Sequence, residues 1–260
     1  VNQKPVSAEG RFGPIGTNLG RDGVPLELAA DAFGQLRLKA RGAVANLLVA
    51  PQARIEVEAA EFSPRRLFAE LGRPLPSTAD PRVLERMSFK AGVTADTGAA
   101  SISDALLILD DSKLRLTASC ADFAKPAIAF DLHLDQIDAD RYLSPSSAAG
   151  AGPPAAGPPA GAPRPKIDYT PLRQLVLNGN AAIDRLTVAR ARIDDVNLKI
   201  AAKEGILSLD PFSMKLYQGT AAGKIVVNVT GERPVTEAHL DLDQVQVNPL
   251  LKDVAGKNFL

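Results

Sequence analysis

The stretch Asp210–Leu251, DPFSMKLYQGTAAGKIVVNVTGERPVTEAHLDLDQVQVNPLL, decides the fold that the sequence predicts. Two strand-like runs lead into a third, Leu240–Val247, in which apolar and polar residues alternate. Asn248 and Pro249 then begin a short Leu-rich segment. Alternation of this kind is typical of a strand with one apolar and one solvated face. The stretch therefore predicts a β-sheet whose last strand leads into a helical turn.

An earlier stretch, Asp104–Leu143, has the same order of elements. Its first residue precedes Asp210 by 210 − 104 = 106 positions, and Asp140 precedes Asn248 by 248 − 140 = 108. Two nearly equal offsets indicate a duplicated unit. The residues Asp140 and Asn248 are good helix caps, so each is predicted to end a strand and start a helical turn.

A third, partial copy precedes these two. The pattern predicts a β-hairpin over 26–49 around the turn Asp31–Gly34, and a strand over Ala53–Ala59. A helix is predicted over Phe62–Leu71, with Ser63 as N-cap, Pro64 in the first turn and Gly72 after the end. A second short capped helix is predicted over Asp80–Met87.

The fold class predicted is mainly β with a few short helices. We expect an elongated, curved, antiparallel-rich sheet built from repeated strand–strand–capped-helix units. The predicted segments are an irregular lead-in (1–25), a first β-rich part with two repeat units (26–143), a linker or loop insertion (144–165), and a second β-rich part with the third unit (166–260). The linker contains seven prolines and four glycines, which exclude helix and strand.

Composition narrows the function. Lys plus Arg and Asp plus Glu are 30 each, so the net charge is zero and gives no electrostatic reason to bind nucleic acid. The single cysteine, Cys120, excludes an intrachain disulfide and a Cys-based zinc site. There is no signal peptide and no apolar span long enough for a membrane helix. The chain is predicted to be an excised piece of a longer protein, with any anchor outside it.

Chemistry-bearing motifs are scarce. His133 and His239 do not align in the repeat, and Asp241 and Asp243 alternate with Leu240 and Leu242 as a solvated strand face does. There is no nucleophile elbow, no phosphate-binding Gly loop and no His–Glu zinc motif. The sequence therefore predicts no enzyme, no metal site and no cofactor.

An aliphatic sheet face must be covered by helices, by a second sheet or by something else. The predicted helices are few and short, so two interpretations remain open from the residues: an exposed groove that takes acyl chains, or two apolar faces packed as a sandwich. The candidate groove residues are the aliphatic positions of the two repeated strands: Leu132, Leu134, Leu240, Leu242, Val245 and Val247.

Several phrases resemble the AsmA family of bacterial envelope proteins. They are FSPRRLFAELG (62–72), TADPRVLERMSFKAGVTAD (78–96), FDLHLDQIDADRYLSP (130–145), VARARIDDVNLKIAAKEGILSLDPFSMKLYQGTAAGKIVVNVTGERP (188–234) and LDLDQVQVNPLLKDVAG (240–256). The resemblance covers most of 26–260, and the block 188–256 is the most specific part. It offers no catalytic residues to carry over.

The resemblance implies a body in the periplasm of a Gram-negative bacterium, anchored to the inner membrane, with a role in outer-membrane biogenesis. It also implies a relation to the TamB-type β-groove proteins, which are thought to move phospholipids. The expectation is a non-enzymatic module that handles phospholipid or another acyl-chain ligand along an aliphatic groove. The alternative is a sandwich-like adaptor that binds envelope protein partners through an exposed strand edge. A hydrolase, the third class, would need a perturbed titratable pair that the sequence does not reveal.

Overall fold

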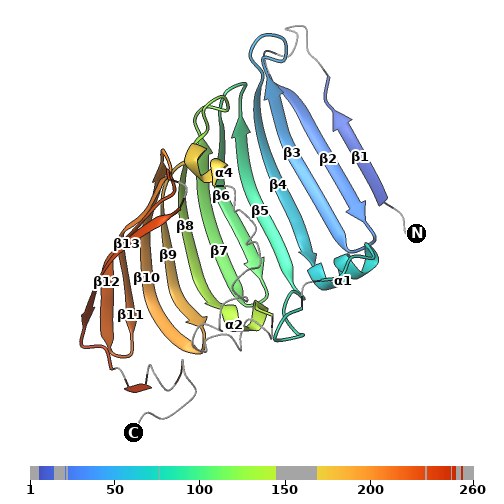
Figure 1. The fold of residues 1–260 in the computed structure, drawn as a ribbon. Helices are drawn as coiled ribbons and strands as arrows, with labels where there is room; N and C mark the ends of the chain where they lie inside the picture. The colour runs from blue at the N-terminus through green and yellow to red at the C-terminus, as the bar shows by residue number, and fades with distance from the viewer. Residues whose placement is uncertain are drawn as a thin grey trace, which may run out of the picture. The chain divides into compact units, whose positions relative to one another are not determined.

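The computed structural model describes residues 6–14, 21, 23–75, 77–144, 169–231, 233–246, 248–249 and 253. Strands dominate these residues (Figure 1). The strands are β1 (Val6–Phe12), β2 (Val24–Ala32), β3 (Leu36–Ala45), β4 (Gln52–Phe62), β5 (Met87–Ala95), β6 (Ala100–Leu109), β7 (Ser112–Cys120), β8 (Ala127–Asp138), β9 (Val176–Val188), β10 (Ala191–Lys203), β11 (Ile206–Leu216), β12 (Gly219–Asn228) and β13 (Val235–Asp243). The helices are α1 (Pro64–Glu70), α2 (Ala139–Tyr142) and α4 (Thr170–Gln174). The predicted fold class, mainly β with a curved antiparallel-rich sheet and a few short helices, is confirmed.

The chain divides into two compact units. Unit 1 comprises 1–75 and 82–134, and unit 2 comprises 76–81 and 135–260. In unit 1 the strands β1 to β8 lie in chain order, each antiparallel to the next. In unit 2 the strands β9 to β13 are arranged in the same way. Most neighbours within a unit are joined by short turns, which favour adjacent antiparallel strands. The exceptions are β1–β2 and β4–β5, whose connections are 13–23 and 63–86, the second of which contains α1.

The turns are built from residues with positive φ. Gly34 has φ +64 in the β2–β3 turn, and its N–H donates to Asp31 Oδ1 over 3.0 Å. Gly205 has φ +77 in the β10–β11 turn. Glycine adopts this conformation without steric cost, and the β2–β3 turn lies where the sequence predicts it. The β9–β10 turn instead places two non-glycine residues there, Ala189 (φ 50) and Arg190 (φ 67).

Two β-bulges mark the repeat. Asp104 (φ 50) is an extra residue of β6, because Ile102 and Ala105 face Ala118 and Leu116 across β7. In β11 the register shifts between Leu209 and Phe212, around Asp210. The aspartates that begin the two repeated stretches thus both lie at bulges, where the chain inserts a residue and bends.

Helix α1 follows the sequence prediction closely. Ser63 is the N-cap and its side chain accepts the N–H of Arg66, Pro64 occupies the first turn, and Gly72 (φ +63) follows the end. Proline costs nothing at this position, because the first-turn N–H has no partner inside the helix. This confirms the predicted cap, which directs the chain out of β4 and into α1.

Four sequence predictions are wrong in detail. The lead-in 1–25 is not wholly irregular, because it contains β1 and the start of β2. The segment 80–87 forms turns rather than a helix. Asp140 does not cap α2: the N-cap is Asp138. The last strand ends at Asp243, short of the predicted 247. The predicted linker 144–165 lies, apart from Ser144, outside the described residues.

Candidate functional site

One face of the sheet in unit 1 is aliphatic, because the register places the apolar residues of successive strands opposite one another. Leu116 of β7, for example, faces Ala105 of β6 and Leu132 of β8. Three further cross-strand rows run in the same direction. They are Leu26–Gly42–Ile55–Val93–Ile102–Ala118–Phe130, Val24–Val44–Ala53–Ala95–Ala100–Cys120–Ile128, and Ala30–Leu38–Ala59–Phe89–Leu107–Leu114–Leu134.

The opposite face of unit 1 is polar. Arg41 faces Glu27 on one side and Glu56 on the other, and Lys39 faces Glu58. Opposite charges across strands attract weakly at a solvated surface, but a slip by one residue would bring the charges onto the aliphatic face. The two faces therefore define the register together.

The aliphatic face of unit 1 is only partly covered. Val24, Leu26, Ala59 and Ala91 are buried, whereas most of the other aliphatic residues of β3 to β8 are half-buried. Leu28 keeps 45% of its surface exposed. Among the described residues of each unit, the strands pack chiefly on their sheet neighbours and no second sheet covers the apolar face. Within either unit the sandwich arrangement is therefore not seen.

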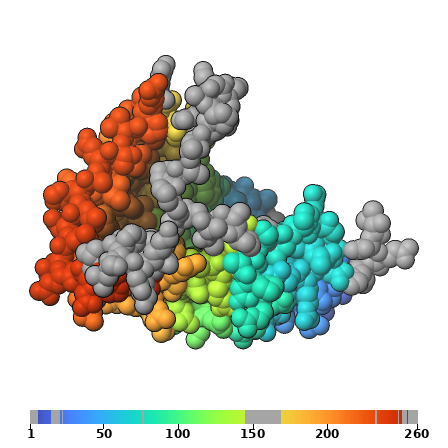
Figure 2. Space-filling view, turned by 60° about the horizontal axis from the view of Figure 1, so that its bottom comes forward, coloured from blue at the N-terminus to red at the C-terminus, as the bar shows by residue number. Residues whose placement is uncertain are grey.

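The helix α1 and the segment 82–86 lie together at one end of unit 1, in the cyan region that Figure 2 shows. Val83 in this segment is 0% exposed. The Arg65 guanidinium donates to the Val83 carbonyl over 2.9 Å, and the Ser63 hydroxyl donates to Glu85 over 3.0 Å. These contacts tie the helix to the chain that leads into β5.

Asp110 fixes the same segment from the β6–β7 turn. Its carboxylate accepts the backbone N–H groups of Leu84, Glu85 and Arg86 over 2.7, 3.0 and 3.1 Å, and the residue is 8% exposed. Three N–H groups directed at one carboxylate cannot also take part in a helix. This explains why the capped helix predicted over 80–87 does not form.

Unit 2 has an aliphatic face of the same kind. Phe212, which is 5% exposed, faces Leu198 of β10 and Gly223 of β12. On the other side of β12, Gly223 faces Leu240 of β13, and Ala221 faces Leu242. The aliphatic residues become more exposed from β11 to β13: Phe212 is almost fully buried, whereas Leu240 and Leu242 are 55% and 59% exposed.

The six predicted groove residues are placed as follows. Leu132 and Leu134 lie half-buried on β8, on the aliphatic face of unit 1. Leu240 and Leu242 lie on the aliphatic side of β13 in unit 2. Val245 follows β13 and is half-buried. Val247 lies outside the described residues.

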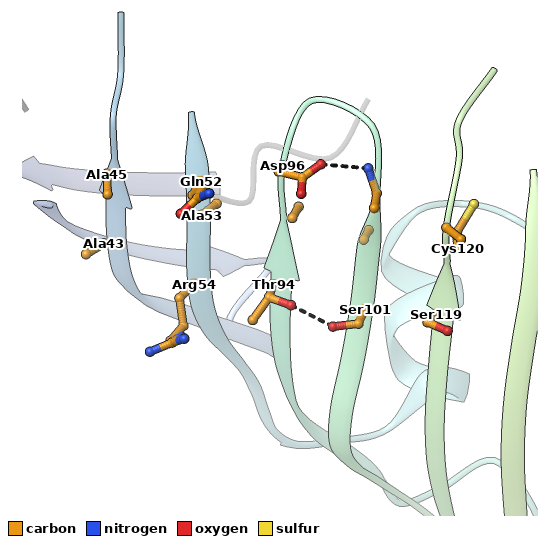
Figure 3. A pocket seen from close by; sticks show the side chains of 14 residues that line it. Ala43, Ala45, Gln52, Ala53, Arg54, Thr94, Asp96, Ser101, Ser119 and Cys120 are labelled. Carbon is orange, nitrogen blue, oxygen red and sulfur yellow. Dashed lines mark hydrogen bonds between the residues drawn. The ribbon is translucent and has the colours of Figure 1, made fainter. Parts of the chain in front are cut away.

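The structure also has surface hollows, and their polar lining residues belong to the polar face of the sheet, opposite the aliphatic face. One of about 550 Å³ lies at the loop end of β3 to β7 (Figure 3). Its polar side chains include Arg54, Thr94 and Ser101, and the two hydroxyls are hydrogen-bonded over 2.6 Å. Asp96 accepts the N–H groups of Gly98 and Ala99, and these two hydrogen bonds lower the pKa of its carboxyl group.

The other perturbed titratable groups also have structural partners. The hydrogen bond to Asp195, over 2.7 Å, raises the pKa of Lys215. Desolvation, together with the hydrogen bond to Asp253, raises the pKa of Tyr217. In the described part of the chain, no three His, Cys, Asp or Glu side chains gather closely enough to hold a metal ion.

The model of the AsmA family matches residues 35–260, which include most of both units and all six candidate residues. The chain belongs to the AsmA family. This membership indicates involvement in envelope biogenesis. Comparisons of this AsmA protein with curated proteins and with solved structures found no match.

Within the described ranges, no helix is both long and apolar enough to cross a membrane. The described helices α1, α2 and α4 have seven, four and five residues. The apolar residues of this AsmA protein thus lie mainly on strands, at the positions that the register assigns to one face.

Proposed function

We propose that this AsmA protein is a non-enzymatic module of the periplasm that binds phospholipid acyl chains along the aliphatic face of its sheet. The observation that carries the proposal is the one-sided sheet: in each unit, an aliphatic face without a second layer among the described residues. A soluble protein seldom leaves contiguous apolar surface of this kind uncovered unless the surface binds a ligand. The family membership supports an envelope role.

The dimensions of the face suit an acyl chain lying parallel to the strands. The aliphatic positions of β7 run from Leu114 to Cys120, six residue steps. At about 3.4 Å per residue this is roughly 20 Å. The hydrocarbon of one bilayer leaflet is about 15 Å thick, half of the ~30 Å core. A tail with the span that it has in one leaflet therefore fits on the face.

The energetics favour exchange with a membrane over release into water. Exposing each CH₂ group to water costs about 0.8 kcal/mol, so a long tail does not leave for water unaided. An aliphatic sheet face resembles the bilayer interior, so transfer between the two changes the free energy little. A module of this kind carries or passes lipid without a chemical step, which is why no catalytic residue is proposed.

We also propose that the full-length protein is held at the inner membrane of a Gram-negative bacterium by a segment outside this chain. That position would place the aliphatic face beside a source of phospholipid. The proposal predicts that lipid accompanies the protein through purification in mild detergent.

The test compares matched substitutions on one strand. Leu132→Asp places a charge on the aliphatic face of β8, whereas Ala129→Asp places the same charge on the exposed polar face. We expect Leu132→Asp to lower the amount of co-purified phospholipid, measured by lipid extraction and mass spectrometry, and Ala129→Asp to leave it unchanged. Equal lipid content in both variants and the parent would contradict the proposal.

A second variant protects the test against loss of folding. Leu240→Asp combined with Leu242→Asp changes side chains that are more than half exposed, so the fold should tolerate both. Circular dichroism checks that the variant is folded. A folded double variant should retain less lipid than the parent, in proportion to the share of the face that β13 provides.

A scaffold or adaptor function is the second candidate, and the exposed strand β13 favours it. All nine of its residues are exposed. An adaptor would carry no lipid and would retain envelope proteins in a pull-down through the strand edge. Protein partners retained equally by the parent and the Leu240→Asp/Leu242→Asp variant, with no lipid in either, would favour this function over the first.

A further inference from the structure

The β3–β4 turn presents aliphatic side chains to solvent. Residues 46–51 read Asn-Leu-Leu-Val-Ala-Pro, and we call 47–50 the apolar tip. Leu48 is 73% exposed and Val49 is 86% exposed, the largest fractions among the Leu, Ile, Val and Phe residues that the structure describes. Turns usually consist of Gly, Pro, Asn, Asp or Ser, and a run of exposed apolar residues is unfavourable unless it has a function. The apolar tip is therefore a candidate contact surface.

The backbone holds this turn in shape. Asn46 has φ 55, and its carbonyl accepts the N–H groups of Val49 and Ala50, both over 3.2 Å. The side chains of Leu48 and Val49 contribute little to folding, because both lie mostly in water. Substitutions at these two positions should therefore change binding and leave the fold intact.

A second exposed apolar residue lies at the same end of unit 1. The register aligns Ala53, near the start of β4, with Cys120 at the end of β7. Phe123 in the β7–β8 loop is 49% exposed, and its backbone N–H donates to the Gly98 carbonyl over 2.9 Å. Three strand spacings of about 4.8 Å separate β4 from β7, so the apolar tip and Phe123 lie roughly 14 Å apart along this end of the sheet.

Charge distinguishes this end of unit 1 from the other. No Asp, Glu, Lys or Arg occurs between Arg41 and Arg54, a run of 54 − 41 − 1 = 12 residues that contains the apolar tip. At the other end, Phe68 and Leu71 are 38% and 48% exposed, but they lie within 61–73, which has five charged residues. Moving a charged side chain out of water is costly, and the apolar tip has none to move. The end with the apolar tip is therefore the one suited to enter hydrocarbon.

We infer that the apolar tip and Phe123 insert into the surface of a phospholipid bilayer. Two separate protrusions suit a fluid surface that closes around each of them, whereas a protein partner binds a central cluster of residues. The apolar surface also continues from the tip to the aliphatic face, because Val44 and Ala53, on either side of the turn, pair within one row of that face. The choice of a bilayer rests in this respect on the proposed function. A tail bound along the strands would then have one end at the membrane.

The length of β4 makes the inference specific to one end. The strand has eleven residues between the β3–β4 turn and α1 (Figure 1). Ten steps of about 3.4 Å place the two ends roughly 34 Å apart. Both ends can enter one bilayer surface only if the sheet lies flat on it, so Leu71 beside α1 provides a matched control.

A single tryptophan reports where the protein meets the membrane. The chain contains no Trp, so Val49→Trp gives a signal from the apolar tip alone. We expect its emission to shift to shorter wavelength on addition of phosphatidylcholine vesicles, and to become protected from a water-soluble quencher. Leu71→Trp, at the other end of β4, should show neither change.

Vesicle flotation measures the affinity. Leu48→Asp combined with Val49→Asp should weaken binding to phosphatidylcholine vesicles about 100-fold, roughly tenfold for each apolar side chain that no longer inserts. Phe123→Asp should weaken it about tenfold, and Leu71→Asp should leave it unchanged. Mixing phosphatidylglycerol into the vesicles, or raising the salt concentration, should change the affinity little, because the apolar tip is uncharged. Circular dichroism verifies that each variant is folded.

Four outcomes overturn the inference. The first is a parent chain that does not bind vesicles. The second is unchanged emission of Val49→Trp when the chain binds, which would place the contact elsewhere. The third is an equal loss of affinity in Leu71→Asp and in the double variant, which would lay the whole sheet flat on the membrane. The fourth is self-association of the parent without vesicles that the double variant abolishes, which would make a second copy of the chain the occupant.

Lipid extraction separates this inference from the proposed function. A parent chain that carries phospholipid through purification but does not bind vesicles would remove the inference and leave the proposed function standing. A parent chain that binds vesicles through the apolar tip but carries no phospholipid would remove the proposed function and leave the membrane contact.

Discussion

Replacing Asp110 tests whether a single carboxylate holds the segment 84–86 in place beside the β6–β7 turn. The carboxylate accepts three backbone N–H groups from 84–86 and is 8% exposed. Alanine at this position leaves all three donors without their acceptor. It also places an ordinary residue at φ 51, which Asp and Asn tolerate better than most residues.

The magnitude follows from the hydrogen bonds. Each bond to a charged acceptor contributes about 1.5–3 kcal/mol, so three give an upper bound of roughly 4.5–9 kcal/mol. The freed N–H groups can reach water once the segment loosens, so we expect Asp110→Ala to lower the free energy of unfolding of unit 1 by about 3–5 kcal/mol. Asp110→Asn keeps one acceptor oxygen and should cost about 1–2 kcal/mol.

The neighbouring residue provides the control. Asp111 accepts one bond from Arg86 over 3.0 Å, and its side chain is 61% exposed. Exposed pairs contribute about 0–1 kcal/mol, so Asp111→Asn should change little. Urea unfolding followed by circular dichroism measures the stability, and hydrogen exchange of 82–86 locates the change. The reasoning fails if Asp110→Ala costs no more than Asp111→Asn, or if exchange at 82–86 is unaltered.

Three further predictions concern other sites. Asp140→Ala should destabilise the β9–β10 turn by about 2 kcal/mol, since two charge-assisted hydrogen bonds are lost; faster exchange at 189–190 checks this. Gly42→Ala should cost about 1–3 kcal/mol in urea unfolding, because a Cβ there would clash with the backbone of Arg54, whereas Ala40→Gly should cost less. Asp96 has a lowered pKa in the folded state, so its turn should stabilise the protein fully above the ordinary aspartate pKa of 3.8 and lose that contribution as pH falls through the folded pKa. A carboxyl NMR titration midpoint at or above 3.8 would contradict this.

The sequence predicts the strands of this protein well because alternation has a local physical cause. Each residue of β4 or β7 points to the face opposite its neighbour, so the apolar face can be read from the residues alone. The cap at Ser63 is equally local, because its acceptor and the N–H of Arg66 are three residues apart. The family resemblance, which is confirmed over 35–260, could likewise be recognised from the sequence alone.

The errors occur where distant residues decide the backbone. The helix expected over 80–87 has a suitable start, but Asp110 takes three of its N–H groups from 24 to 26 positions away. Asp140 has the residue type of a cap, yet it binds a turn 49 residues later. No local pattern contains these partners.

Of the candidate site, the sequence reveals which residues are aliphatic but not how far each is covered. Leu132 and Leu240 have the same alternation, yet Leu132 is half-buried and Leu240 is 55% exposed, because β13 has one sheet neighbour among the described strands. The sequence-based predictions also do not include the glycines at which two strands approach each other too closely for a Cβ atom. Gly42 and Gly223 interrupt aliphatic rows where a Cβ would meet the neighbouring backbone, and glycine inside an alternating strand is the signal that points to them.

The bulge at Asp104 is a position where the length of β6 can change by one residue without changing which side chains face which side of the sheet. Successive side chains of a strand point to opposite faces of the sheet. Deleting one residue from a regular part of β6 would therefore move every side chain beyond the deletion from the aliphatic to the polar face, or the reverse. Deleting Asp104 itself would only convert the bulge to regular pairing, with both sides kept. Insertions and deletions at bulges can therefore change the length of such strands without exchanging the aliphatic and polar faces of the sheet.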